Sequence, residues 1–90
     1  MTKRKITKMD NLEFKPFNRY GPTVPGMSWH KISFDKDTNF GTYISKLEPG
    51  TKTIPHIHKG YEEFLILDGE LIDSDGTVFK KGDFVTFEPN

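Results

Sequence analysis

The sequence predicts an all-β protein made of short strands in a barrel or sandwich. Alanine, the best helix former, is absent from the 90 residues, whereas β-branched residues and eight phenylalanines are abundant. Such side chains suit the pleated, half-buried surface of a sheet. Eight glycines and six prolines are spread between short apolar runs. Short strands separated by turn residues are typical of small β-barrels and sandwiches.

Strands and turns alternate along the chain from residue 29 onward. The expected strands cover residues 29–34, 40–47, 51–58, 62–67, 77–80 and 84–87. Glu48-Pro49-Gly50 predicts a turn, because proline presets the first corner and glycine tolerates a positive φ. Asp68-Gly69 and Asp75-Gly76 predict hairpin turns. Simple alternation places Trp29 and Phe34 on opposite faces of their strand.

The length of the chain and the positions of its glycines and prolines indicate one domain. Domains usually contain about 100–200 residues, so 90 residues suffice for one small domain. Residues 1–28 are expected to form an extended N-terminal lead-in, because prolines and glycines interrupt residues 12–27 and exclude a long helix. Residues 29–90 are expected to form the β-domain. No internal repeat or low-complexity stretch indicates a second domain.

Composition excludes several classes of function. Thirteen basic and thirteen acidic residues give a net charge of zero, whereas general nucleic-acid binders carry a basic excess. The basic cluster Lys3, Arg4, Lys5 and Lys8 is interpreted as a solvated terminus. The absence of cysteine excludes disulfides and thiolate metal sites. The longest apolar run, residues 64–67, is too short for a membrane span or a signal peptide. We therefore expect a cytoplasmic protein without a membrane or nucleic-acid partner.

His56, His58 and Glu62 are candidate metal ligands. Residues two apart in a strand share a face, with Cα atoms about 6–7 Å apart. Gly60 allows the chain to turn, and a returning strand roughly 5 Å away would bring Glu62 toward the same point. Two imidazoles and one carboxylate are the ligand set of non-haem iron sites and of His2Glu zinc sites. The alternative is that both histidines are ordinary surface residues.

The segment around these residues resembles the first cupin motif, G(X)5HXH(X)3,4E(X)6G. Its fixed positions fall on Gly50, His56, His58, Glu62 and Gly69. Residues 82–90 resemble the start of the second cupin motif more loosely, and the histidine ligand of that motif would fall three residues after the last residue. The sequence of residues 24–29, 61–70 and 71–76 resembles the sequences of the cupin domains of ChrR-like zinc-binding anti-sigma factors. It also resembles those of related small dioxygenase-like cupins.

The resemblance implies a cupin fold, a conical antiparallel β-barrel or double-stranded β-helix of jelly-roll type. It implies one divalent metal ion (Fe, Zn, Ni or Mn) on His56, His58 and Glu62, and a small-molecule substrate. A metal-dependent enzyme of dioxygenase or lyase type is the expected function. The alternative is a non-catalytic sensor or ligand-binding module, since the cupin domain senses a signal in the anti-sigma relatives. Many cupins dimerise, so a homodimer is expected. The second motif stops at Asn90 and would leave a sheet edge unpaired, with three explanations open: the sequence is a fragment, the chain ends there, or a partner chain supplies the missing strand.

Glu62 is favoured over Glu63 as the carboxylate ligand. Three residues separate Glu62 from His58 and six separate it from Gly69, as the first cupin motif requires. In a regular strand it also shares a face with Phe64 and Ile66, which would then line the pocket, whereas Glu63 points the other way. A bulge in this strand would reverse the assignment.

Other residues have two interpretations each. Trp29 and Tyr43 are candidates for lining the ligand pocket, and the alternative is core or rim packing. His30 is a candidate additional ligand, and the alternative is a half-exposed strand histidine. Asp73 and Asp75 resemble a fragment of a calcium loop, but that fragment is too short and lacks the distal Glu, so both are interpreted as turn formers.

Overall fold

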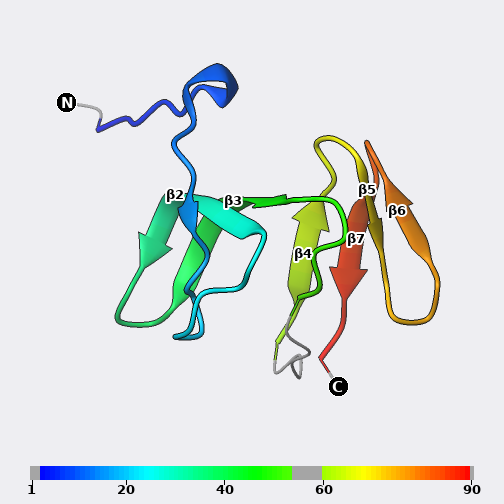
Figure 1. The fold of residues 1–90 in the computed structure, drawn as a ribbon. Coiled ribbons are helices and arrows are strands. Elements are labelled where there is room, and N and C mark those ends of the chain that lie inside the picture. The colour runs from blue at the N-terminus through cyan, green and yellow to red at the C-terminus, as the bar shows by residue number, and fades with distance from the viewer. Residues whose placement is uncertain (1–2, 54–59, 90) are drawn as a thin grey trace. The chain divides into compact units, whose positions relative to one another are not determined.

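The regular structure of the described residues consists almost wholly of β-strands. The computed structural model describes residues 3–53 and 60–89 and divides the chain into two compact units, Met1–Ile54 and Pro55–Asn90. The described ranges contain seven strands and one short 3-10 helix, and each strand pair is antiparallel (Figure 1). The predicted all-β class is therefore confirmed. No helix in these ranges is long and apolar enough to cross a membrane.

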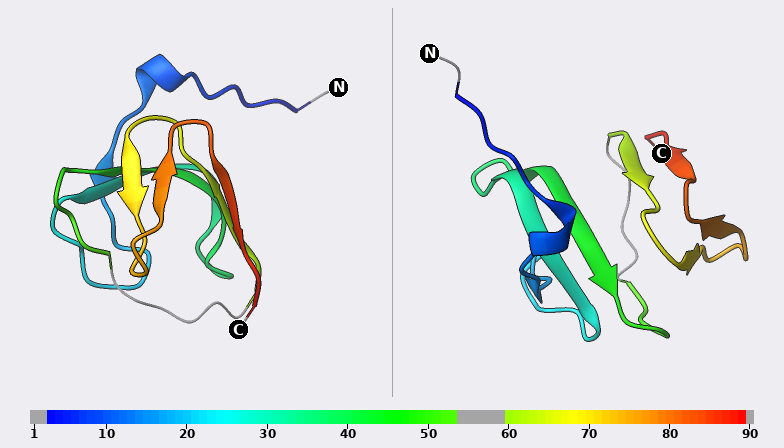
Figure 2. Two further views of the ribbon diagram at one scale, coloured as in Figure 1. Left: turned by 90° about the vertical axis from the view of Figure 1, so that its right-hand side faces the viewer. Right: turned by 90° about the horizontal axis from the view of Figure 1, so that it is seen from above.

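The first unit contains a three-stranded sheet. Its elements are η1 (Met9–Asn11), β1 (Lys15–Pro16), β2 (Met27–Asp35) and β3 (Phe40–Leu47), and the strand order is β1-β2-β3. The long β2–β3 hairpin is seen most clearly from above in Figure 2. Strand β3 has the predicted bounds, and β2 extends the predicted strand by a residue or two at each end.

A short edge strand joins the predicted lead-in, residues 1–28, to this sheet. Pro16 lies in β1, and an edge strand tolerates proline because one side needs no ladder hydrogen bond. The Phe17 N–H donates to the Met27 carbonyl (3.1 Å), and the Val24 N–H donates to the Phe17 carbonyl (3.1 Å). The lead-in is thus part of the packed first unit. The predicted domain division stays a prediction.

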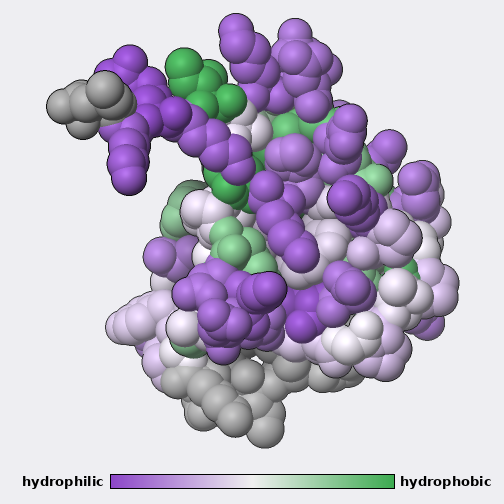
Figure 3. Space-filling model, turned by 90° about the vertical axis from the view of Figure 1, so that its left-hand side faces the viewer, coloured by the Kyte–Doolittle hydropathy of each residue, from purple (hydrophilic) through white to green (hydrophobic). Residues whose placement is uncertain are grey.

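The N-terminal basic cluster is exposed. The side chains of Lys3, Arg4, Lys5 and Lys8 all face solvent, and the N-terminal arm is largely hydrophilic on the face shown in Figure 3. The Lys5 Nζ donates a hydrogen bond to the Ile32 carbonyl at 2.8 Å. These positions agree with the interpretation of this segment as a solvated terminus.

A β-bulge corrects the predicted faces of β2. Lys31 pairs with Tyr43 and Ser33 pairs with Thr42, so Ile32 is the extra residue in the ladder. One extra residue reverses the alternation beyond it. Phe34 therefore returns to the face of Trp29, and their ring centroids lie 5.2 Å apart, although simple alternation predicts opposite faces.

The core of the first unit is built around Trp29. Its side chain is 4% exposed and packs with Phe17 and Val24, which are also buried. The Phe17 and Tyr43 rings meet the indole edge-to-face, with centroids 4.8 and 5.2 Å away. This geometry is the favoured one for aromatic pairs, because it sets positive ring edges against negative faces. The lead-in thus supplies two of the three buried side chains found among the described residues.

The described part of the second unit, residues 60–89, contains two two-stranded sheets. They pair β4 (Glu62–Leu65) with β7 (Phe84–Phe87), and β5 (Glu70–Ile72) with β6 (Val78–Lys80). The hairpin predicted at Asp68-Gly69 is wrong, because the strands on either side of it pair elsewhere. The Ile66 N–H donates to the Asp83 carbonyl, and the Ile66 carbonyl accepts from the Gly82 N–H, so β4 extends its ladder toward β7. Asp68-Gly69 instead turns the chain from one sheet to the other.

Two other expectations concern turns and the strand at residues 51–58. The hairpin at Asp75-Gly76 is confirmed, since β5 and β6 pair across it, although its loop spans residues 73–77. The turn at Glu48-Pro49-Gly50 is also confirmed, because the Thr51 N–H donates to the Glu48 carbonyl and Gly50 has a φ of 82°. Residues 51–53 form no strand, and residues 54–58 lie outside the described residues.

Replacing Trp29 by alanine is expected to lower the free energy of unfolding by about 3–5 kcal/mol, because a large buried ring leaves a cavity. The control is Phe40→Ala, since the Phe40 side chain is 72% exposed and surface changes stay within about 0.5 kcal/mol. Urea unfolding of both variants measures the difference. Equal losses in the two variants would contradict the assigned core.

Candidate metal centre

The structure describes one of the three candidate ligands. Glu62 begins β4, is half-buried, and pairs in register with Phe87 of β7. His56 and His58 lie outside the described residues. Among residues 3–53 and 60–89, no three His, Asp or Glu side chains lie close enough to hold a metal ion. The complete ligand set therefore stays a prediction.

The face on which Glu62 lies is the one predicted. The β4–β7 ladder runs from Glu62↔Phe87 to Leu65↔Phe84 with no register shift, so β4 is regular. Glu62, Phe64 and Ile66 are half-buried, while Leu65 is exposed. Because a regular strand alternates its side chains, Glu62 shares its face with Phe64. The bulge that would have reversed this assignment is not present in β4.

Glu63 has a different environment. Its side chain is exposed, and its Oε2 accepts a hydrogen bond from the Thr86 hydroxyl at 2.8 Å. Thr86 is its cross-strand partner in β7, so both lie on the outer face of the sheet. Two adjacent glutamates therefore differ in surroundings, because the pleat turns one toward aromatic side chains and the other toward solvent.

Three phenylalanine rings gather on the face of Glu62. The centroid of Phe64 lies 5.7 Å from that of Phe79 and 6.1 Å from that of Phe87, and Phe79 and Phe87 are 6.4 Å apart. We call these three residues the aromatic cluster. Phe79 comes from β6, so the cluster joins the two sheets of the second unit. Sequence reasoning predicted the place of Phe64 but missed the other two, because strand pairing decides which side chains meet.

Trp29 and Tyr43, candidates for lining the pocket, both lie in the first unit. Trp29 is part of the core described above, and Tyr43 is half-buried against it. The Tyr43 hydroxyl accepts a hydrogen bond from Nη1 of Arg19 at 2.9 Å. The Arg19 guanidinium also lies 5.3 Å from the Tyr43 ring centroid, a cation–π distance. Nothing in the chain's pattern signalled Arg19, and the pocket-lining role stays a prediction for both rings.

His30 is held by the lead-in. Its Nδ1 lies 3.0 Å from the carbonyl oxygen and 3.3 Å from the amide nitrogen of Glu13. Which of the two it pairs with depends on the tautomer, because a neutral imidazole nitrogen either donates or accepts. The half-buried position of His30 on β2 fits a strand histidine that fastens the lead-in, and only Nε2 remains for any other partner.

Asp73 and Asp75 form the turn between β5 and β6. The Gly76 N–H donates to the Asp73 carbonyl at 2.9 Å, and the Thr77 N–H donates to the Asp75 carboxylate at 2.9 Å. Hydrogen bonds from the backbone and the side chain of Thr77 lower the pKa of Asp75, because they stabilise its charged form. These contacts agree with the interpretation of both residues as turn formers.

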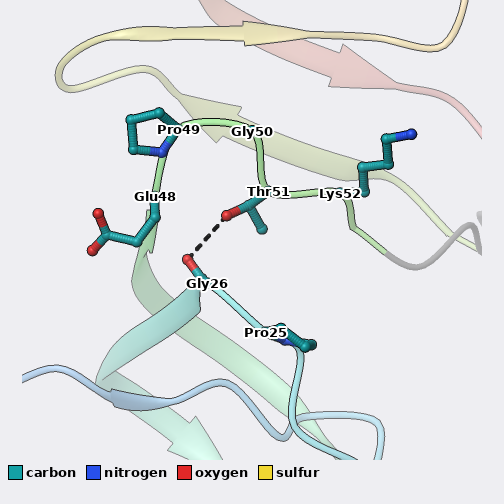
Figure 4. Close-up of a pocket in the computed structure, with 7 residues that line it drawn as sticks. All are labelled: Pro25, Gly26, Glu48, Pro49, Gly50, Thr51 and Lys52. Carbon is teal, nitrogen blue, oxygen red and sulfur yellow. Dashed lines mark hydrogen bonds between the residues drawn. The ribbon is translucent and has the colours of Figure 1, made fainter.

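A surface hollow of about 520 Å³ lies in the first unit, where residues 48–52 cross residues 25–26. The Thr51 hydroxyl donates to the Gly26 carbonyl at 3.2 Å (Figure 4). A Cβ atom at Gly26 would collide with that hydroxyl oxygen, so glycine permits the crossing. The Glu48 and Lys52 side chains point away from each other (Figure 4). The lining of the hollow thus comes from two backbone segments that cross, residues 25–26 and 48–52.

Comparison with known proteins identifies one family. The sequence pattern of the ChrR cupin-like domain matches residues 2–90, nearly the whole chain. The match includes the lead-in as well as the strands of both units. No curated protein and no solved structure matches the chain.

The alternation along β4 predicts different effects for two neighbouring substitutions. Glu62→Gln is expected to lower the metal content of the purified protein several-fold, because an amide is a poorer ligand than a carboxylate for a divalent ion. Glu63→Gln keeps an acceptor for Thr86 and is expected to leave the metal content unchanged. Elemental analysis of both variants checks this. A loss of metal from Glu63→Gln alone would mean that the other face carries the site.

Proposed function

The chain belongs to the ChrR cupin-like family, and from that membership we propose that it is a small metal-binding cupin. We propose further that it is a metal-dependent enzyme of dioxygenase or lyase type, with a small organic substrate. The observation that carries the proposal is the position of Glu62, half-buried at the start of a regular strand. That is the residue to which the first cupin motif assigns the carboxylate ligand.

The proposed metal ligands are His56, His58 and Glu62. Two neutral imidazoles and one carboxylate place one negative charge at the site, a donor set that suits Fe, Zn, Ni or Mn in the divalent state. Such an ion would supply Lewis-acid or redox chemistry to a bound substrate. Three protein ligands would leave coordination positions for that substrate, as catalytic metal sites require.

The chain's own residues support this chemistry in two ways. The bulge-free β4–β7 ladder fixes the face on which Glu62 projects, because every residue of β4 is paired. Phe64 lies two residues beyond Glu62 in β4 and Phe87 is its cross-strand partner in β7, so apolar side chains neighbour the carboxylate on its face of the sheet.

The proposal includes a homodimer in the cytoplasm, with neither nucleic acid nor a membrane as partner. The zero net charge supports the absence of a polyanionic partner. The outer face of β4–β7 supports self-association, because the cross-strand pair Leu65 and Phe84 is 49% and 62% exposed, and apolar surface patches favour association. Analytical ultracentrifugation is expected to give twice the 10.4 kDa mass of one chain. A mass of one chain at all concentrations would contradict this part.

A non-catalytic metal-binding sensor is the second candidate. It is favoured by one observation, the match of nearly the whole chain to the ChrR cupin-like domain, because the anti-sigma relatives use their cupin domain for sensing. The two functions differ in the metal site. An enzyme needs an open site whose ligands exchange quickly, whereas a saturated site favours sensing or a structural role. Exchange of bound water, measured by NMR relaxation on the Mn-loaded protein, separates them.

The first test is elemental analysis of protein purified without metal-affinity steps. We expect about one divalent ion per chain, and His56→Ala is expected to lose most of it because two remaining ligands hold an ion weakly. A chelator should lower the melting temperature of the wild type by on the order of 10 °C, because a ligand that binds only the folded state stabilises it. Metal content unchanged in His56→Ala would show that the ligands are wrong. No metal in the wild type, even after reconstitution, would refute the proposal.

A further inference from the structure

We propose that Asp68-Gly69 is a site of spontaneous covalent modification, at which the aspartate converts to isoaspartate through a succinimide ring. The only co-reactant is water, and the reaction needs neither a metal ion nor a partner protein. The residues that carry the inference all lie in the described part of the second unit, residues 60–89. The inference therefore goes beyond the proposed function and is independent of it.

The reaction joins two groups that an Asp-Gly pair holds next to each other. The Gly69 amide nitrogen attacks Cγ of the protonated Asp68 carboxyl, so an N–Cγ bond forms and the amide proton and the carboxyl hydroxyl leave as water. Water then adds to one of the two ring carbonyls. When it cleaves the bond between the nitrogen and the backbone carbonyl carbon of Asp68, Gly69 stays bonded to Cγ and isoaspartate results. One water is lost and one is gained, with no oxidation or reduction.

The chain contains this dipeptide twice, as Asp68-Gly69 and as Asp75-Gly76. All four residues are exposed, and a Cβ atom built on either glycine would meet nothing within 4 Å. Both glycines also have a positive φ, 75° for Gly69 and 88° for Gly76. Local sequence, solvent access and steric room are therefore alike at the two sites. The difference between them lies in their hydrogen bonds.

Hydrogen bonds restrain both reacting groups of Asp75-Gly76. The Gly76 N–H donates to the Asp73 carbonyl at 2.9 Å, so the nitrogen that would attack is already engaged. The Asp75 Oδ1 accepts a hydrogen bond from the Thr77 N–H at 2.9 Å, which directs the carboxylate toward Thr77. The Thr77 hydrogen bonds also lower the pKa of Asp75 and so deplete the protonated acid from which the hydroxyl leaves. The fold thus protects this pair.

Asp68-Gly69 has no such restraint. Within residues 3–53 and 60–89, no hydrogen bond engages the Asp68 carboxylate or the Gly69 N–H. The pair lies outside both ladders of the second unit, because the hydrogen bonds that continue β4 end at Ile66 and β5 begins at Glu70. The Asp68 carboxyl can therefore turn onto the Gly69 nitrogen without breaking a hydrogen bond, and glycine has no Cβ to obstruct the attack.

The product alters the chain where it passes from one sheet of the second unit to the other. Isoaspartate places Cβ of Asp68 in the main chain, so the connection between β4 and β5 becomes one atom longer. The former backbone carboxyl becomes a free carboxylate, so the charge of the residue is kept. The modification therefore changes neither the mass nor the net charge of the chain, and only a method that reads the main-chain connectivity detects it.

The experiment ages the full chain at neutral pH and follows both sites in one peptide. Tryptic digestion yields residues 60–80 as a single fragment, because no lysine or arginine lies between residues 60 and 79. Electron-transfer fragmentation cleaves the Cα–Cβ bond that isoaspartate places in the main chain, and so locates the modified residue. We expect isoaspartate to accumulate several-fold faster at Asp68 than at Asp75.

The matched control is the same chain unfolded in guanidinium chloride. The hydrogen bonds that restrain Asp75 and Gly76 are then lost, so the ratio of the two rates should fall toward unity. Asp68→Glu should abolish the fast reaction, since the longer side chain would have to close a six-membered ring. Asp75→Glu makes the same change at the protected site and should leave the rate at Asp68 at the wild-type value.

Three results would overturn the proposal. Equal rates at the two sites in the folded chain, or a faster reaction at Asp75, would show that the hydrogen bonds do not protect. A ratio that is unchanged in guanidinium chloride would mean that local sequence, and not the fold, sets the difference. The third is an absence of isoaspartate at Asp68 in the folded chain over a time in which the unfolded chain forms it. None of these readouts measures metal, so the proposed function is tested separately.

Discussion

The second unit depends on the register between β4 and β7. The ladder from Glu62↔Phe87 to Leu65↔Phe84 has no extra residue, and because the side-chain period of a strand is two, a slip of one residue would exchange its faces. Such a slip would turn Glu62 to solvent and bring Glu63 against the aromatic cluster. The face on which Glu62 lies therefore follows from the β4–β7 ladder, which the hydrogen bonds of Ile66 with Gly82 and Asp83 continue.

The first unit shows what a single extra residue does. The bulge at Ile32 reverses the alternation of β2, so Trp29 and Phe34 pack together. Gly41, the partner of Phe34, has a φ of 151°, and a Cβ there would collide with the backbone of Ser33 and Phe34. A glycine opposite Phe34, two residues beyond the bulge, allows the strands to approach closely. The two units thus use opposite devices, a bulge in one and strict register in the other, to bring aromatic rings together.

Family membership and local geometry contribute different parts of the functional argument. The family supports a cupin fold, and fold alone does not choose a reaction, since one fold hosts many chemistries. The imidazole and carboxylate donors of His56, His58 and Glu62 are the reason that the proposed cofactor is a divalent metal ion.

The sequence alone determined the all-β class, the bounds of β3 and β7, and the face of Glu62, because composition, turn residues and alternation act locally along the chain. It also indicated the cupin family through the spacing of five residues from Gly50 to Gly69. Only the tertiary structure decided that β4 pairs with β7 rather than across Asp68-Gly69, and that Phe79 and Phe87 join Phe64. Pairing between distant strands depends on contacts that no local sequence pattern predicts. A bulge, likewise, leaves no signal in the alternation of side chains that it interrupts.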